Sequence, residues 1–544
     1  SDVLDAALVA AAVTHALAAL FLLLERRRRA PGWIVAAAAV IASFATAMWV
    51  TGVLTTALVS AAVVGVLVCV LVARLPRFHA SGALLLGSYV ALAPLSMVWL
   101  AHFVAIAELS TVTRVLLLLP LPLGVLFLGP ALVRAFENWE PLIRREWSRP
   151  RAPRPRVGGA RAPVVSVHVP AHAEPPDVVI RTLDSIARLD YPNFEVLVID
   201  NNTSDPELWR RVQAHCERLG ERFRFLHVEG LHGAKAGALN LALDHTRPDA
   251  ELIAIVDADY HVEPDFLAET VAFFDDPSMG FVQTPHAYRG ADTAYLRMCD
   301  REYAVFFATA MVALNERNAG ITVGTMCVIR REAIERAGRW ATWCLTEDSE
   351  LAIRVHASGY SSVYLQKIYG RGLIPETFTG YRKQRFRWSY GPVTEFFAHW
   401  RLYVPGRWRQ PSALTAAQRI HHATHGLQQI VSGIGLLMLP YAGVVAGSML
   451  IHGERLPVPF PLWITVTVLL VAGLAIRWTT YRELLGARVQ DCLLAALAMA
   501  ALAHVVMVAS LTALLRRPVP WQRTSKSVRA ALDGTRLLPS ARRH

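Results

Sequence analysis

Long apolar stretches lie at both ends of the chain, and a more polar block lies between them. A helix needs about 20 apolar residues to cross the hydrocarbon core of a bilayer. Stretches of that kind occur at residues 3–24, 33–52, 54–74, 82–106, 113–135, 425–450 and 459–477. The pattern predicts a polar domain carried between two sets of membrane helices.

Basic residues orient these spans. Arg26 to Arg29 follow the first span, and Arg74 and Arg77 follow the third. Loops rich in Lys and Arg stay in the cytoplasm, so both loops are expected there, with the residues before the first span outside. The fifth span then returns the chain to the cytoplasm, and the polar block is expected to be cytosolic.

A last apolar stretch, 490–515, allows two placements. If it crosses the membrane, the basic residues from Arg516 onward lie outside, against the charge rule. We therefore expect it to lie along the inner surface of the membrane. Its charge-poor composition also suits an ordinary span, and this alternative stays open.

Within the polar block, short apolar runs alternate with helical patterns. The runs at 164–169, 194–199, 223–228 and 252–256 predict buried strands, and 176–189, 206–219 and 234–245 predict helices. This alternation is typical of βαβ units with a parallel sheet. Ligands of such sheets bind beyond the carboxyl ends of the strands, where this chain has polar residues at 170–174, 200–202 and 257–259.

The fourth run ends on two carboxylates, Asp257 and Asp259. Side chains alternate along a strand, so both are expected to point the same way where the strand ends. Two such oxygen ligands suit a divalent cation that also binds phosphates. A loop with two acidic residues is the plainer alternative.

Two glycines, Gly233 and Gly237, flank Lys235 where a helix begins. Small residues let backbone approach a phosphate, the first turn of a helix favours anions, and the lysine adds a positive charge. An ordinary helix start with a solvated lysine is the alternative.

Two further motifs follow. Thr346-Glu-Asp348 opens a predicted helix that runs to His356, with Thr346 as its N-cap. It predicts either a well-formed helix start or a general base, Asp348, for a sugar hydroxyl. The cationic and aromatic segment 381–390 is typical of a helix at a membrane interface, although anchoring alone does not explain the spacing of Gln384, Arg387 and Trp388.

Composition narrows the class of protein. Hydrophobic residues make up 54% of the chain, and the formal net charge is +12. The basic clusters flank apolar segments, so we attribute the charge to membrane topology and expect no nucleic-acid partner. The six cysteines show no CxxC pair or metal-site spacing, which predicts packing thiols in a reducing compartment.

Taken in order, these elements resemble the processive family 2 glycosyltransferases, particularly bacterial cellulose synthases and β-glucan synthase-like proteins. The matching elements are Asp200 after the second strand, Lys235-Ala-Gly-Ala-Leu-Asn240, Asp257-Ala-Asp259, Thr346-Glu-Asp348 and Gln384-Arg-Phe-Arg-Trp388. The segments 200–203, 315–318 and 324–326 look more like β-glucan synthase-type bacterial members than like hyaluronan or chitin synthases. Where the family's first strand commonly ends in Pro-x-Tyr-Asn-Glu, this chain has Pro170-Ala-His172-Ala173-Glu174.

The resemblance implies a role for each matching residue. It implies nucleotide binding by Pro170, His172, Glu174, Asp200, Lys235, Asp257, Gln384 and Arg387, and binding of Mg²⁺ or Mn²⁺ by Asp257 and Asp259. It implies catalysis by Asp348 as general base with Glu347 beside it, and acceptor binding by Thr346 and Trp388. The segment 516–526 looks like the gating loop of cellulose synthases, with Trp521, Arg523, Thr524 and Lys526 as its contacts.

The expected fold is a membrane α-helical bundle carrying a cytosolic α/β domain of the GT-A (nucleotide-diphospho-sugar transferase) type with a mostly parallel sheet. The expected organisation is transmembrane helices over 1–137, a linker over 138–163, the GT-A domain over 164–375, interfacial helices over 376–424, transmembrane helices over 425–478, an interfacial or transmembrane helix over 488–515, and a gating-loop-like segment with a basic tail over 516–544. The implied setting is the bacterial inner membrane.

The implied activity is a processive, inverting transfer of glucose from UDP-glucose to a growing β-glucan that is moved across the bilayer. Alternatives are a polysaccharide synthase that uses a UDP-N-acetylhexosamine, a non-processive transferase that places one sugar on a lipid, and an inert transporter or scaffold. Transporters usually carry charged residues within their spans, whereas these spans are nearly free of charge.

Overall fold

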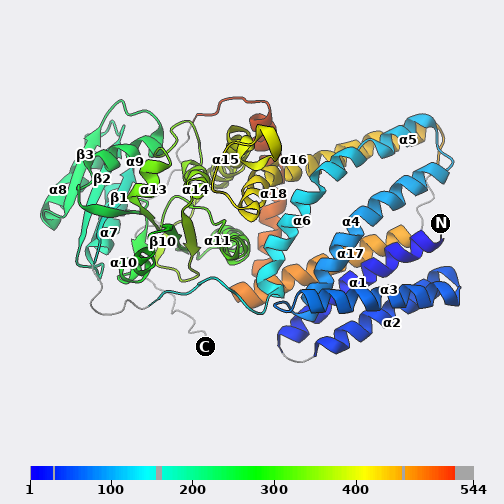
Figure 1. The fold of residues 1–544 in the computed structure, drawn as a ribbon. Helices are drawn as coiled ribbons and strands as arrows, with labels where there is room; N and C mark the ends of the chain where they lie inside the picture. Colours follow the sequence, from blue (N-terminus) through cyan, green and yellow to red (C-terminus); the bar gives the residue numbers. More distant parts are fainter. Residues whose placement is uncertain (1, 28–30, 155–161, 456–459, 521–544) are drawn as a thin grey trace. The chain divides into compact units, whose positions relative to one another are not determined.

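The structure is a computed structural model that describes residues 2–27, 31–154, 162–455 and 460–520 (Figure 1). The chain divides into two compact units, one formed by Ser1–Ser148 and Ile434–Cys492 and the other by Arg149–Gly433 and Leu493–His544. The first unit is helical, and the second contains the sheets. All six cysteines are free thiols, in agreement with the sequence pattern.

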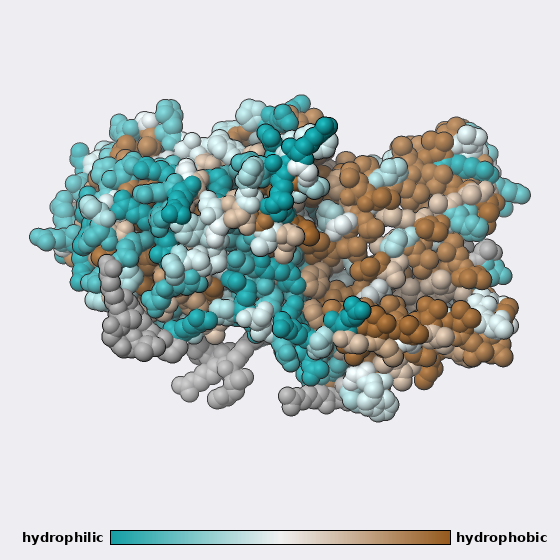
Figure 2. All heavy atoms as spheres, viewed as in Figure 1, coloured by the Kyte–Doolittle hydropathy of each residue, from teal (hydrophilic) through white to brown (hydrophobic). Residues whose placement is uncertain are grey.

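The helical unit is built from apolar helices that agree with the expected spans. Its helices are α1 (Asp2–Arg26), α2 (Gly32–Thr51), α3 (Leu54–Arg74), α4 (Ala80–Ile106), α5 (Thr111–Leu118), α6 (Leu121–Ile143) and α17 (Phe460–Thr479), followed by the π-helical turn η3 (Thr480–Leu484). The boundary between the units falls within α16 (Ala416–Ile451) and α18 (Val489–Leu514). Figure 2 shows hydrophobic side chains covering the surface of the helical unit.

Within the described residues, eight helical segments are long and apolar enough to cross a membrane, so this is a multi-pass membrane protein. The fifth, Thr111–Ile143, comprises α5 and α6, which break at Pro120. The segment extends past the expected end at residue 135, to Ile143. Just beyond its end, Arg144 pairs with the buried Glu140 at 2.6 Å. Helix α18 is among the eight. Length and composition therefore suit a span, and the expected placement of 490–515 along the membrane surface stays a prediction.

A seven-stranded sheet in the order β3-β2-β1-β4-β8-β6-β9 forms the centre of the second unit. Its strands are β1 (Val164–Ala171), β2 (Phe194–Asn201), β3 (Phe223–Val228), β4 (Ala250–Ile255), β6 (Met279–Gln283), β8 (Cys327–Arg330) and β9 (Ser361–Tyr364). The first four pair in parallel, as expected, whereas β8 is antiparallel to both of its neighbours. The mostly parallel α/β fold of the GT-A type is thereby confirmed.

Alternating side chains of β2 pack against helices on opposite faces of this sheet. Val196 and Val198 belong to the cluster that includes residues of α7 (Pro176–Ala187) and α8 (Pro206–Leu219). Leu197 and Ile199 pack with Ala238 and Ala242 of α9 (Ala234–His245). Every residue of β2 is buried, as expected for a strand that is covered on both faces.

The remaining elements complete the polar unit. They are a three-stranded sheet of β5 (His261–Val262), β10 (Gly370–Leu373) and β7 (Tyr288–Arg289), the helices α10 (Phe266–Thr270), η1 (Val271–Asp275), α11 (Ala294–Ala308), α12 (Ala310–Glu316), α13 (Arg331–Arg336), α14 (Glu347–Ala357), α15 (Phe378–Tyr403) and the turn η2 (Gly406–Trp408). The interfacial placement expected for 376–424, which contains α15, stays a prediction.

Candidate active site

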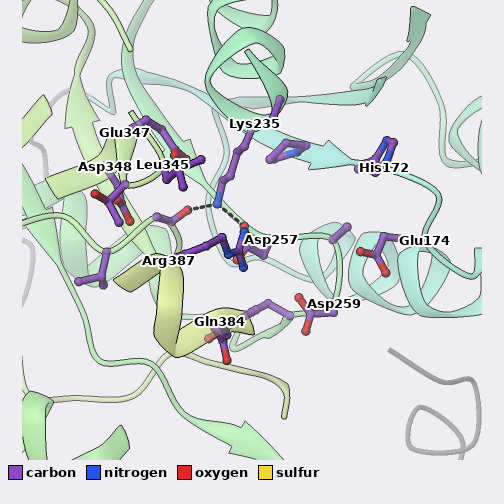
Figure 3. A pocket seen from close by; sticks show the side chains of 18 of the residues that line it. His172, Glu174, Lys235, Asp257, Asp259, Leu345, Glu347, Asp348, Gln384 and Arg387 are labelled. Carbon is purple, nitrogen blue, oxygen red and sulfur yellow. Dashed lines mark hydrogen bonds and ion pairs between the residues drawn. The ribbon is translucent and has the colours of Figure 1, made fainter. Parts of the chain in front are cut away.

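A cavity of about 420 Å³ lies beyond the carboxyl ends of β1, β2 and β4 (Figure 3). It brings together nearly all residues that the sequence singles out. Those among its lining are Pro170, His172, Glu174, Lys235, Asp257, Asp259, Thr346, Glu347, Asp348, Gln384, Arg387 and Trp388. They come from segments more than 200 residues apart, so the fold assembles them as one site.

The two aspartates lie on a turn and not on the strand itself. Strand β4 ends at Ile255, and a hydrogen bond from the Tyr260 amide to the Asp257 carbonyl, 3.0 Å long, closes the turn. The expected alternation along a strand is therefore wrong for Asp257 and Asp259, because neither has strand geometry. Both nevertheless line the same cavity.

Hydrogen bonds from outside the turn fix both aspartates. The Asp257 amide donates to Thr325 Oγ1 at 2.9 Å. The Asp259 side chain is 2% exposed, and its Oδ2 accepts from the Leu373 amide of β10 at 2.8 Å. The smaller sheet thus holds Asp259, whereas Asp257 faces more open space.

Lys235 extends from the first turn of α9 into the cavity. Its Nζ lies 2.5 Å from Asp257 Oδ1 and donates to the Gly324 carbonyl at 2.7 Å. Burial lowers the pKa of Lys235, but the carboxylates of Asp257, Glu347 and Asp348 outweigh burial and raise it overall. The lysine is therefore a permanent positive charge facing three acids, as a binder of a diphosphate should be.

Asp200 is the exception among the expected site residues, because it is not part of the cavity lining. It is 4% exposed; its Oδ1 accepts from Thr203 Oγ1 at 2.7 Å, and its Oδ2 lies 2.7 Å from His227 Nδ1. Thr203 Oγ1 in turn accepts from the Ala173 amide at 2.8 Å. Asp200 therefore supports, through Thr203, the loop that carries His172 into the cavity.

The Thr-Glu-Asp segment opens α14 as expected, but Thr346 does not act as a hydrogen-bonding N-cap. Its hydroxyl donates to Glu395 of α15 instead. Burial, together with the adjacent charge of Asp348, raises the pKa of Glu347 to about 7. Burial also raises the pKa of Asp348, against the lowering effect of Lys235. Both carboxyls are therefore more basic than usual, which a general base requires.

Helix α15 presents the Gln-x-x-Arg-Trp motif to the cavity. Tyr303 of α11 orients it, because its hydroxyl donates to Gln384 Oε1 at 2.5 Å and its ring meets the Trp388 ring edge-on at 5.2 Å. Burial lowers the pKa of Arg387, and the carboxylates of Glu347, Asp257 and Asp348 oppose that change. Arg387 thus adds a second cation near the acids that surround Lys235.

Several lining residues were missed by the sequence analysis. They include Tyr260, His286, Tyr288, Val323, Leu373 and Pro375. At Gly324, which has φ +86°, a Cβ would lie 2.8 Å from Asp348 Oδ2 and 3.3 Å from Lys235 Nζ, so glycine keeps the space between base and lysine open. Burial lowers the pKa of His286 to about 4, so its ring is neutral in the cavity. The lining residues Asn201, Asn202 and Gly324 lie in segments that the sequence analysis singled out, at 200–202 and 324–326.

The expected gating residues Trp521, Arg523, Thr524 and Lys526 lie outside the described residues. The described chain approaches them through Arg517, whose carbonyl accepts from the Tyr390 hydroxyl of α15 at 2.9 Å. Their role in closing over a nucleotide stays a prediction.

The donor set is compatible with a divalent cation bound together with a ligand. Asp257 and Asp259 offer carboxylate oxygens to the same cavity, which suits Mg²⁺ or Mn²⁺. In the described part of the chain, no group of three or more His, Cys, Asp or Glu side chains is arranged to hold a metal ion alone. These two residues therefore fit a cation whose remaining ligands are phosphate oxygens and water.

Comparisons with known proteins found a family match over the segment that contains this cavity. Residues 162–391 match the family model described as "Glycosyltransferase like family 2". "Probable glucomannan 4-beta-mannosyltransferase 9" of Oryza sativa subsp. japonica is 30% identical over 252 residues, which are 44% of this chain and 48% of that protein. "Cellulose synthase catalytic subunit [UDP-forming]" of Pseudomonas fluorescens is 28% identical over 305 residues, 54% of this chain and 39% of that protein.

Among solved structures, a mannosyltransferase of Pyrobaculum calidifontis in complex with GDP-Man and Mn²⁺ is similar with a TM-score of 0.47 and 22% identity, over 73% of this chain and 98% of that one. The chain spans about half or less of the length of the curated relatives above. The matched segment 162–391 contains every cavity residue named above. The segment 162–391 of this multi-pass membrane protein, which contains the cavity, is therefore similar to glycosyltransferase family 2.

Proposed function

We propose that the protein is a membrane-bound hexosyltransferase that builds a β-linked polysaccharide from a nucleoside diphosphate sugar. The observation that carries the proposal is that one cavity contains both halves of such a site. Lys235, Asp257 and Asp259 form the half suited to a diphosphate, and Asp348 and Trp388 form the half suited to a sugar acceptor.

In this proposal, Asp348 takes the proton of an acceptor hydroxyl, and the hydroxyl oxygen attacks the anomeric carbon of the donor. The new carbon–oxygen bond forms as the bond to the β-phosphate oxygen breaks on the opposite face, so an α-linked donor gives a β-glycoside. Lys235 and Arg387 stabilise the negative charge that grows on the leaving diphosphate. A cation held by Asp257 and Asp259 would add to this charge stabilisation.

Trp388 gives the acceptor a flat apolar face, because its ring is held by Tyr303 at the cavity lining. A sugar ring can stack there with its hydroxyl directed at Asp348. If the growing chain stays bound after each addition and its new terminal sugar moves onto Trp388, the transfer is processive. Together with the membrane helices, this supports export of the growing polymer across the bilayer.

We favour UDP-glucose as donor and β-glucan as product, on the motif pattern and the similarity to a cellulose synthase subunit. The relatives named as glucomannan 4-beta-mannosyltransferases, at 30% and 31% identity, favour a mannosyl donor as the second candidate. Glucose and mannose differ in the orientation of one hydroxyl, and a few pocket contacts are enough to decide between such substrates.

The test uses the full chain, purified and placed in lipid nanodiscs with Mg²⁺ or Mn²⁺. UDP-glucose, GDP-mannose and UDP-N-acetylglucosamine are supplied separately, and nucleotide release, product length and linkage are measured. We expect one hexose donor to give a long β-linked polymer. A single glycolipid would favour the non-processive alternative, and no nucleotide release from any donor would contradict a transferase.

A further inference from the structure

A buried carboxyl group connects the two helices that carry the acceptor half of the cavity. Glu395 lies on α15, seven residues after Trp388, and is 1% exposed. It is not among the cavity-lining residues. Its side chain points to the first turn of α14, where Thr346, Glu347 and Asp348 lie.

One carboxylate oxygen of Glu395 accepts hydrogen bonds from both hydroxyl groups of that turn. Thr346 Oγ1 donates to Glu395 Oε1, and Ser349 Oγ donates to the same oxygen at 2.7 Å. Thr346 is thereby withdrawn from capping its own helix, as the lack of a side-chain cap at this helix start shows. The position of the turn thus depends on a residue of α15.

Helices α14 and α15 also pack closely next to these hydrogen bonds. A Cβ built at Gly391 of α15 would lie 1.9 Å from Thr346 Oγ1 and 2.6 Å from Thr346 Cγ2. Gly391 lies one helical turn before Glu395, so contact and hydrogen bonds share one face of α15. Asp348 lies two residues after Thr346. The backbone amide of Ser349 donates to Asp348 Oδ1 at 2.9 Å, so the same turn also orients the Asp348 side chain.

We infer that Glu395 is a positioning residue, which holds the Thr346–Asp348 turn in register with the Gln384, Arg387 and Trp388 side chains of its own helix. The inference rests on the proposed function, because it assigns to Glu395 the alignment of the proposed base with the acceptor. A misplacement of about 1 Å can cost about a hundredfold in rate.

The surroundings of Glu395 show which substitutions preserve this role. Burial raises its pKa to about 8, the hydroxyls of Thr346 and Ser349 lower it, and the charges of Asp348 and Glu350 raise it again. Two more titratable groups, Cys344 and Tyr403, lie close enough for the charge of Glu395 to raise their pKa values. The carboxyl group is therefore mostly neutral near pH 7, and a glutamine, which has the same reach and one carbonyl oxygen, can accept both hydroxyl bonds.

The test compares Glu395→Gln, Glu395→Asp and Glu395→Ala, with Thr394→Ala as matched control. The Thr394 hydroxyl donates to the Gly391 carbonyl of its own helix, at 2.7 Å, and not to the α14 turn. With the donor identified for the wild type, kcat, donor KM and nucleotide diphosphate binding are measured. We expect Gln to keep kcat within about threefold, and Asp, which lacks the reach, and Ala to lose about 10- to 100-fold with donor KM nearly unchanged.

A double-mutant cycle with Ser349→Ala separates positioning from general damage. If Glu395 acts through the turn, the losses of Ser349→Ala and Glu395→Ala are not additive, because both remove the same bond. If the Ala variant does not fold, the Gln and Asp variants decide. Equal kcat for Gln, Asp and wild type, or a loss confined to donor KM, overturns the inference, whereas an inactive wild type overturns the proposed function.

Discussion

Lys235 and Asp257 form an ion pair within the cavity, with Nζ 2.5 Å from Oδ1. The pair joins the helix that follows β3 to the turn that follows β4. A diphosphate with its cation offers new partners to both residues, the phosphate oxygens to the lysine and the cation to the carboxylate. If the protein binds a nucleoside diphosphate sugar as proposed, we expect the ion pair to be exchanged for these ligand contacts when the donor binds.

Replacing Lys235 with Gln should weaken binding of the nucleoside diphosphate, because a neutral amide cannot replace the charge that faces the phosphates. We expect about a tenfold rise in Kd, equal to about 1.4 kcal/mol, by calorimetry in the presence of Mg²⁺. Lys367→Gln is the control, since Lys367 pairs with Asp265 and Glu269 away from the cavity. Unchanged affinity in Lys235→Gln would remove the lysine from the diphosphate site.

Removal of divalent cations should stop transfer, because Asp257 and Asp259 otherwise add negative charge next to a negatively charged diphosphate. We expect EDTA to abolish nucleotide release and Mg²⁺ or Mn²⁺ to restore it. Binding of UDP, measured without turnover, should strengthen when the cation is added, and Asp259→Asn should lose that response. Full activity in excess chelator would contradict a metal role for these aspartates.

Asp348→Asn tests the proposed base. The variant keeps the shape of the side chain but cannot accept a proton, so we expect kcat to fall by about 10²–10⁴-fold while nucleotide binding is kept. Asp244→Asn is the control, because Asp244 pairs with Arg339 at the surface. A polymer yield near the wild-type level from Asp348→Asn would show that another group takes the proton.

Much of the fold could be predicted from the sequence, because local periodicity determines it. The runs at 164–169 and 223–228 became β1 and β3, and the pattern at 234–245 became α9 with the same bounds. The antiparallel strand β8, Cys327–Arg330, was not expected. It follows a long segment whose periodicity is irregular, and its direction is fixed by pairing with β4 and β6, which are remote in sequence.

The candidate site could also be predicted only in part from the sequence. Motif spacing identified Lys235, Asp257 and Asp348, because each lies in a short motif where a strand ends or a helix begins. Asp200 lies outside the cavity lining, bound by His227 and Thr203, and its expected contact with a nucleotide stays a prediction. The expected N-cap bond of Thr346 is absent, because Glu395 takes the threonine hydroxyl from 49 residues away. A capping pattern in sequence cannot show such a competitor.

Transfer should speed up as pH rises from about 6 to about 8. The pKa of Glu347 is raised to about 7 by burial and by Asp348, and burial raises the pKa of Asp348 as well, so the Glu347 carboxyl ionises near neutral pH and Asp348 at a higher pH than a free aspartate. The base acts only when ionised, so activity is lost as pH falls. Lys235 lowers both pKa values, and Lys235→Gln should therefore shift the profile of kcat to higher pH. A kcat that is flat or falls between pH 6 and 8 at saturating donor would contradict this assignment.

Gly391→Ala should disturb the site although Gly391 itself is not a residue of the cavity lining. In an open helix position, alanine is favoured over glycine by about 1 kcal/mol. Here the added Cβ would lie 1.9 Å from Thr346 Oγ1, so Thr346 must move and its bond to Glu395 is strained or lost. Forced packing of this kind costs about 1–3 kcal/mol.

We expect Gly391→Ala to lower the unfolding temperature and to reduce kcat by about 10-fold or more, with little change in nucleotide diphosphate binding. Gly435→Ala is the matched control, because a Cβ at this position of α16 meets nothing within 4 Å. Thermal unfolding and kcat are measured for both variants in nanodiscs. Wild-type kcat in Gly391→Ala would mean that the turn with Asp348 tolerates displacement, and the coupling between α14 and α15 would then have no part in the transfer.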